Sequence, residues 1–354
     1  MKEKENRSTF TFQIEPKHYL KHNYLTYCND VLVSLLKYAD EQELSTIQIE
    51  FEDENAAELF EQLDNDSDDW QTWLIQNGFK DQIYKAYFRH TFFSLIKDFC
   101  QYMLESINCA AKMKVAVSYA LLRKPLKDTL GYIEWLYVDR NEMLDFLTRG
   151  EPKDLEISKE KAREHTTAVE KKCGKNSYFN FRYDKSSETS LEHIWNNASH
   201  LVTTKYKLSK TEPGNLNFVF ADEEILRRFS DYYYLIVPAI MSYATDLICE
   251  MFEEFAPLNR YTLLLNQLNR FLKSLAIIED ISFQDVKELY SKSNLPIICP
   301  RCGLKMKMTD SRMRKFASGK CTCYRCYKSI NTGRYIFDWE KIDFSFKDTE
   351  CSRK

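Results

Sequence analysis

Four cysteines near the C-terminal end of the chain are arranged for binding a metal ion. Cys299 and Cys302 form one C-x-x-C pair, and Cys323 and Cys326 form a second pair after twenty intervening residues. Two thiolates separated by two residues can bind one ion from a single tight turn. Two such turns supply the four tetrahedral sulfurs that zinc takes in structural sites. Cys321 is an alternative ligand to Cys323, and we prefer Cys323 because it makes the two pairs match. The spacing predicts a structural Zn²⁺ cofactor in a site closed to substrate.

The first pair reads Cys299-Pro300-Arg301-Cys302-Gly303 and resembles the knuckle of the zinc-ribbon family. The resemblance covers residues 297–341 and implies a small β fold, with strands expected over Leu304–Met308 and Arg334–Trp339. The same sulfurs also suit iron, as in rubredoxin-like proteins, and a redox-active cysteine pair is a further alternative. A closed site of this kind does no chemistry itself and can serve only to fold a small module.

Positive charge is concentrated around these cysteines. Residues 301–334 carry ten Lys or Arg and one acid, Asp310, although the whole chain has a net charge of −3. Cationic side chains neutralise phosphates and aromatic rings stack on unpaired bases. We therefore predict contact with DNA or RNA through Arg312, Arg314, Lys315, Arg325 and Tyr324, the first three in the loop between the cysteine pairs. The rival prediction pairs this basic segment with the acidic residues 40–69, within the chain, between copies or with another protein.

One weak candidate for catalysis lies in the middle of the chain. His193, Asn197 and His200 recur at helical spacing beside an apolar face, if that helix continues to Thr204. Two histidines can supply general acid and base groups near neutral pH, although a structural polar stripe has the same pattern. The Arg-then-His spacing of HEPN-type ribonucleases occurs at none of the histidines, so that chemistry is not carried over.

The elements that must position these residues are mainly helical. Glycine is scarce, at 8 of 354 residues, which favours long helices and short loops over a many-stranded fold. We predict a mainly α, multi-helix body with a small N-terminal β element and the C-terminal zinc ribbon. The expected units are a mixed α/β region with the acidic segment over 1–80, the helical body over 81–294, and the zinc ribbon and tail over 295–354.

Local signals define several of the helices. A helix is expected over Gln82–Met113, and the next should divide near Lys124 because proline follows. Asp139 with Glu142 has the spacing of a capping box, and Gly150 should end that helix in a left-handed conformation. The remaining expectations are a strand over Thr46–Phe51, a solvated helix or arm over Asp154–Cys173, a helix from Ser190 to about Leu201, a hairpin over Leu201–Phe220, and helices from Asp222 to Phe255, Arg260 to Ile278 and Ser282 to Ser291.

The composition also excludes some functions. The glycines are too widely spaced for a dinucleotide turn, a Walker loop or a Gly-x-Ser-x-Gly elbow. The charged opening residues lack the apolar core of a targeting segment. The most apolar run, Tyr232–Ala244, is too short for a membrane span of about 20 residues and indicates a buried helix. The scattered cysteines, 11 in all, favour a reducing cytoplasm over a disulfide framework.

The leading prediction is a cytoplasmic zinc-containing protein that binds nucleic acid through its C-terminal module, with the helical body as effector or interaction platform. The first alternative is a nuclease or other hydrolase, such as a defence or toxin-like effector, that uses the His193/His200 stripe. The second is an interaction or structural protein in which zinc only stabilises the fold. Whether the body is catalytic is left open by the sequence.

Overall fold

The fold was taken from a computed structural model of the chain. It describes residues 14–46, 49–51, 54–61, 69–173, 177–184, 190–204, 210–214, 216–217, 223–258, 260–279, 281–292, 299, 301–317 and 320–331. Within these residues the protein is mainly α-helical, as the composition predicts, and the strands form a single two-stranded sheet near the C-terminal end.

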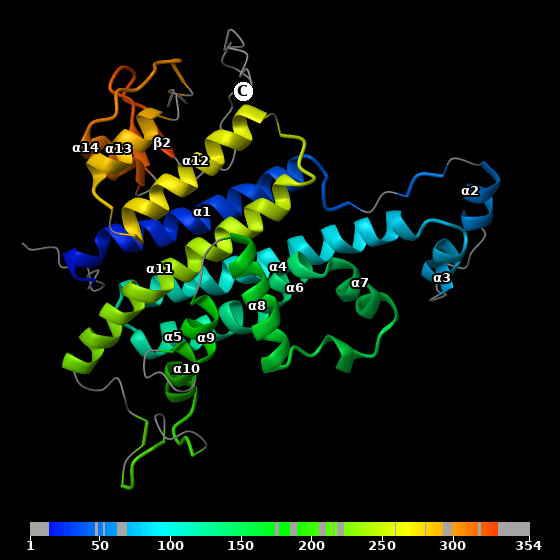
Figure 1. The fold of residues 1–354 in the computed structure, drawn as a ribbon, viewed down its shortest axis with the longest axis horizontal. Helices are drawn as coiled ribbons and strands as arrows, with labels where there is room; N and C mark the ends of the chain where they lie inside the picture. The colour runs from blue at the N-terminus through cyan, green and yellow to red at the C-terminus, as the bar shows by residue number, and fades with distance from the viewer. Residues whose placement is uncertain are drawn as a thin grey trace, which may run out of the picture.

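Long helices form the centre of the molecule (Figure 1). Helix α1 (Tyr19–Glu41) packs between α4 (Lys80–Ala111) and α11 (Glu223–Glu253), and α12 (Arg260–Ile277) lies against α1 and α11. By length and composition α11 could cross a membrane, but 83% of its most apolar window is buried inside the fold. The apolar run of this helix therefore forms core, as expected from its length. A short 3₁₀ turn, Pro16–His18, precedes α1.

The segment after α4 is one nearly continuous helical path. Helix α5 (Val115–Arg123) passes into a π-helix, Lys124–Thr129, and then into α6 (Leu130–Val138). The division near Lys124 is as predicted, but the chain widens into a π-helix instead of breaking, because the wider turn accommodates the proline that lacks an amide hydrogen.

Helix α7 (Arg140–Arg149) follows with half of the predicted capping box, since the amide of Asp139 donates to the carbonyl of Trp135 and not to Glu142. The amide of Glu142 donates to the Asp139 carboxylate at 3.0 Å. Gly150, however, is not left-handed: its φ is −83° and its ψ is 165°, so the chain leaves α7 in an extended conformation. The extended exit leads directly into a 3₁₀ turn, Pro152–Leu155.

The charged segment expected to be solvated is partly buried. Helix α8 (Lys159–Cys173) packs against α6 and α9 (Tyr178–Tyr183), and α9 in turn contacts α10 (Leu191–Ser199). The buried residues of α8 recur at helical spacing, but three of them are polar, so the sequence shows no continuous apolar stripe. They are Ala162, His165, Thr166, Val169 and Glu170.

The strand predicted over Thr46–Phe51 is wrong for the residues that are described there. The backbone amide and carbonyl of Glu50 bond to the side-chain amide of Gln82, at 2.9 and 3.1 Å, so this backbone is paired without a neighbouring strand. Helices α2 (Glu54–Glu61) and α3 (Asp69–Gln76) follow. No strand occurs in the described parts of Leu201–Phe220 either, where the amide of Asn217 donates to the carbonyl of Leu201.

The C-terminal module sits on the helical body. Helix α13 (Phe283–Lys292) leads to it, α14 (Asp310–Ala317) packs against α12 and α13, and strands β1 (Lys320–Thr322) and β2 (Ser329–Asn331) form an antiparallel hairpin. The backbone of Cys321 pairs with that of Ile330 in this hairpin. Leu304–Met308 is not the predicted strand, since Lys305 alone makes a bridge, and Arg334–Trp339 lies outside the described residues.

Candidate metal centre

The two cysteine pairs occupy turns of the same geometry. In the first turn, the amide of Gly303 donates to the carbonyl of Cys299 at 2.9 Å, and Gly303 has a φ of 67°. In the second, the amide of Tyr327 donates to the carbonyl of Cys323 at 2.9 Å, and Tyr327 has a φ of 54°. A left-handed residue after the second cysteine thus ends both turns. Glycine adopts that conformation freely, whereas tyrosine does so at a cost of about 1–2 kcal/mol.

The hairpin and the preceding loop bring the four sulfurs together. The Sγ atoms of Cys299 and Cys326 are 3.6 Å apart, those of Cys302 and Cys323 are 3.7 Å apart, and all four lie within 4.8 Å of one another. A disulfide requires about 2.05 Å, so these are not bonded pairs. A tetrahedron with zinc–sulfur bonds of about 2.3 Å has edges of about 3.8 Å, which is close to the two shorter separations. This donor set can hold a metal ion.

The electrostatics of the cluster differ between its two buried cysteines. Cys299 and Cys323 are fully buried, and burial raises the pKa of Cys299 to about 12. Burial also acts to raise the pKa of Cys323, but hydrogen bonds from the backbone amides of Cys326 and Arg325 outweigh it and lower the pKa to about 7. Cys323 is therefore the first of the two to ionise near neutral pH, and thiolate is the form that binds metal.

Cys321 is not a member of this cluster. It lies in strand β1, is 2% exposed, and burial raises its pKa. The four sulfurs that lie within 4.8 Å of one another include that of Cys323 and not that of Cys321, as the matched spacing of the two C-x-x-C pairs predicts.

The basic residues of the module lie mostly at its surface. Arg314 and Lys315 are exposed but lie on helix α14, not in the loop that the sequence suggested. Arg312 is half-buried: its guanidinium lies 4.3 Å from the ring centre of Tyr324 and donates to the carbonyl of Lys307 at 2.8 Å. The other exposed cations of this module, among its residues with described side chains, are Arg301, Lys305, Lys307, Arg325 and Lys328.

The acidic segment lies far from this surface. Figure 1 shows α2 and α3 at the opposite end of the molecule from α14. The one acid among residues 301–334, Asp310, instead forms an ion pair with Lys287 of α13 at 3.1 Å. Residues 62–68 of the acidic segment and residues 332–334 of the basic one are outside the described residues. The described parts of the acidic and basic segments lie too far apart to pair within one chain. Pairing between them would have to occur between copies of the chain.

The proposed polar stripe is interrupted by the end of its helix. Helix α10 ends at Ser199, so His200 follows it in an extended conformation and is exposed, whereas His193 is 4% exposed. The Asn197 side chain accepts a hydrogen bond from the Thr203 hydroxyl at 3.4 Å. A catalytic role for these residues stays a prediction.

Sequence reasoning missed a buried charge network next to this helix. The Arg182 guanidinium contacts both carboxylate oxygens of Glu134 at 2.7 Å, and both side chains are fully buried. Tyr243 and Thr166 donate to the same carboxylate at 2.7 and 3.1 Å. The participants come from α6, α8, α9 and α11. No local motif joins residues so distant in the sequence.

A second missed group is Glu15, His18 and Asp231, whose ligand atoms also lie within 4.8 Å of one another. The Lys17 ammonium bonds to Glu15 at 3.0 Å and to Asp231 at 2.6 Å, so both carboxylates of this group already have a cationic partner. The cysteine cluster is therefore the stronger metal candidate.

In comparisons with known proteins, no family model, no curated protein and no solved structure matches the chain. Function must therefore be argued from the site itself.

Proposed function

We propose that the four cysteines bind one structural zinc ion and that the module they stabilise binds nucleic acid. Zinc is favoured because four sulfurs in a tetrahedral arrangement suit it and leave no open coordination position. Metal binding to such a site contributes folding free energy, because the ligands converge only in the folded chain. The zinc ion would hold the two cysteine turns together, and the side chains that point outward from these turns would bind the nucleic acid.

The observation that carries the nucleic-acid proposal is the outward cationic surface around the second turn. Arg325 and Lys328 are exposed there, and the exposed Arg314 and Lys315 lie on the adjoining helix α14. The single acid of the segment, Asp310, forms an ion pair with Lys287 of α13. Lysine and arginine supply the sequence-independent attraction to phosphate that dominates affinity for polynucleotides.

Two tyrosines of the same turn favour unpaired bases. Tyr324 is 41% exposed and Tyr327 is 80% exposed. Tyr327 occupies the left-handed position that Gly303 fills in the first turn, so the chain accepts local strain and displays an aromatic ring to solvent. Arg312 stacks on Tyr324 and orients that ring. Aromatic rings beside cations are what single-stranded DNA or RNA recognition uses.

The test begins with metal analysis of the purified protein, for which we expect one zinc per chain. Binding of labelled single- and double-stranded DNA and RNA is then measured by fluorescence anisotropy at low salt. The variant Arg314→Gln/Lys315→Gln/Arg325→Gln keeps the structural Arg312 and should lose at least about tenfold in affinity.

The matched control neutralises three exposed lysines of the helical body, Lys112, Lys114 and Lys153, and should bind like the wild type. Unchanged affinity in the Arg314/Lys315/Arg325 variant would overturn the proposal. If the wild-type protein binds no polynucleotide but self-associates at low salt, the basic surface instead pairs with the acidic segment of another copy.

A further inference from the structure

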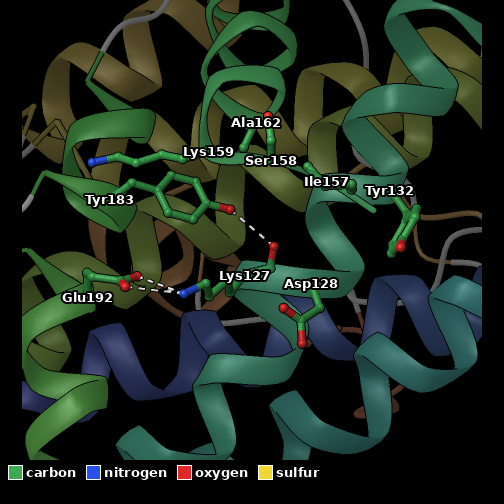
Figure 2. A pocket seen from close by; sticks show the side chains of 9 residues that line it. All are labelled: Lys127, Asp128, Tyr132, Ile157, Ser158, Lys159, Ala162, Tyr183 and Glu192. Atoms are coloured by element: carbon green, nitrogen blue, oxygen red, sulfur yellow. Dashed lines mark hydrogen bonds and ion pairs between the residues drawn. The ribbon is translucent and has the colours of Figure 1, made fainter. Parts of the chain in front are cut away.

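A second site lies on the other side of the molecule, in a cavity of about 510 Å³. Its wall is formed by the π-helix, the start of α6, the residues that open α8, and α9 and α10 (Figure 2). Ligand pockets commonly have volumes of about 300–1,000 Å³ and carry a few convergent polar groups. None of the elements that form this cavity contributes to the cysteine cluster.

Hydrogen bonds and a buried ion pair connect the helices that form one side of the cavity. Arg182 donates to the carbonyl of Leu126 at 3.0 Å and bonds to the buried Glu134, which ties α9 to the π-helix and to α6. The next residue, Tyr183, lies in the cavity wall and donates its hydroxyl to the carbonyl of Lys127 at 3.1 Å. A π-helix is rare and is frequently found at functional sites. In this protein the hydrogen bond from Arg182 connects the π-helix to α9, while Lys127 and Asp128 of the same π-helix line the cavity.

The two ends of the cavity differ in charge. At one end, the ammonium of Lys127 contacts both Glu192 carboxylate oxygens at 3.0 and 3.2 Å, and Lys159 extends toward the same end (Figure 2). Two ammonium groups against one carboxylate leave a net positive charge there. The exposed Asp128 follows Lys127 along the π-helix, and Tyr132 lies at the end opposite Lys159 and Glu192 (Figure 2).

We propose that this cavity binds a mononucleotide whose base carries an exocyclic amino group, with the phosphate at the lysine end and the amino group at Asp128. An ammonium binds phosphate as a point charge, and a carboxylate accepts hydrogen bonds from a base amino group but repels a carbonyl oxygen. Ile157 and the half-buried ring of Tyr132 supply apolar surface for the base. Recognition is by side chains, so it does not need the glycine-rich loops that the sequence lacks.

The proposal is tested by isothermal titration of the full-length protein with AMP, IMP and inorganic phosphate. AMP and IMP differ at C6, which carries an amino group in AMP and a carbonyl in IMP, and at the adjoining N1, which carries a hydrogen only in IMP. The wild-type protein should bind AMP at least about tenfold more tightly than IMP, the effect of one charge-assisted hydrogen bond. Inorganic phosphate alone should bind more weakly than AMP.

Two exposed substitutions separate the ends of the cavity. Lys159→Met should weaken AMP and IMP alike by about tenfold, because it removes a phosphate contact. Asp128→Asn should remove most of the preference for AMP, because an amide offers a donor to the carbonyl of IMP as well as an acceptor to the amino group of AMP. Lys112→Met, on an exposed lysine at the end of α4, is the control and should change nothing. Lys127 is left intact because it neutralises the buried Glu192.

Several results would overturn the assignment: no AMP binding up to millimolar concentration, equal affinity for AMP and IMP, phosphate binding as tight as AMP binding, or variants that bind like the wild type. The inference does not rest on the zinc or on the basic surface. Failure of one proposal therefore leaves the other standing.

Discussion

The buried ion pair between Arg182 and Glu134 allows a quantitative test of the fold. Replacing Arg182 by Met keeps an unbranched chain in the same space but removes both guanidinium contacts at 2.7 Å and the bond to the Leu126 carbonyl at 3.0 Å. The Glu134 carboxylate then remains fully buried with only the hydroxyls of Tyr243 and Thr166. Breaking a buried pair by removing one partner costs about 3–5 kcal/mol, a large fraction of the roughly 5–15 kcal/mol that stabilises a domain.

Urea unfolding of the zinc-loaded protein, followed by circular dichroism, measures this loss. The double variant Arg182→Met/Glu134→Gln should recover about half of it, because the remaining amide is neutral and can accept from one hydroxyl and donate to the other. The two substitutions are therefore predicted to be strongly non-additive. A loss below about 1 kcal/mol for Arg182→Met, or simple additivity, would refute the argument that the pair clamps α9 to α6 and the π-helix.

Three further predictions concern single residues. Cys323→Ser should lose the zinc, whereas Cys321→Ser should keep one zinc per chain by metal analysis; equal loss in both would contradict the ligand assignment. Tyr327→Gly should retain zinc and unfold no more easily, gaining up to about 1 kcal/mol by relieving the left-handed strain, yet it should bind single-stranded polynucleotide more weakly. Burial lowers the folded-state pKa of His165 below its ordinary 6.5, so the unfolded chain binds the proton more readily and stability falls as the pH drops below about 6.5. His165→Gln should reduce that fall in urea midpoints measured between pH 7 and 5.5, and an unchanged pH dependence would count against it.

Features fixed by neighbours in the sequence were predictable. The four-cysteine cluster follows from two matched C-x-x-C turns, and the cap of α7 follows from Asp139 and Glu142 three residues apart. Helix α4 begins and ends within two residues of its predicted bounds, Gln82–Met113. In each case the physical cause, a tight turn, a side-chain-to-backbone bond or an apolar stripe, acts within a few residues of its own position.

Features that depend on distant partners were not predictable. Residues Thr46–Phe51 alternate like a strand, but the described backbone there pairs with the Gln82 side chain. The sequence of α8 predicted a solvated helix because its buried face carries the polar residue Thr166. Thr166 bonds to Glu134, which lies 32 residues earlier in the chain. The cavity at the π-helix is likewise assembled from segments whose separate sequences hold no motif.

The most direct test of the central proposal is the salt dependence of polynucleotide binding by the zinc-loaded protein. A plot of log affinity against log salt for single-stranded DNA should fall with a slope corresponding to several phosphates. In the Arg314→Gln/Lys315→Gln/Arg325→Gln variant that slope should be smaller by about 2 to 3. An affinity independent of salt, or an identical slope in the variant, would contradict the assignment of the C-terminal module as a nucleic-acid surface.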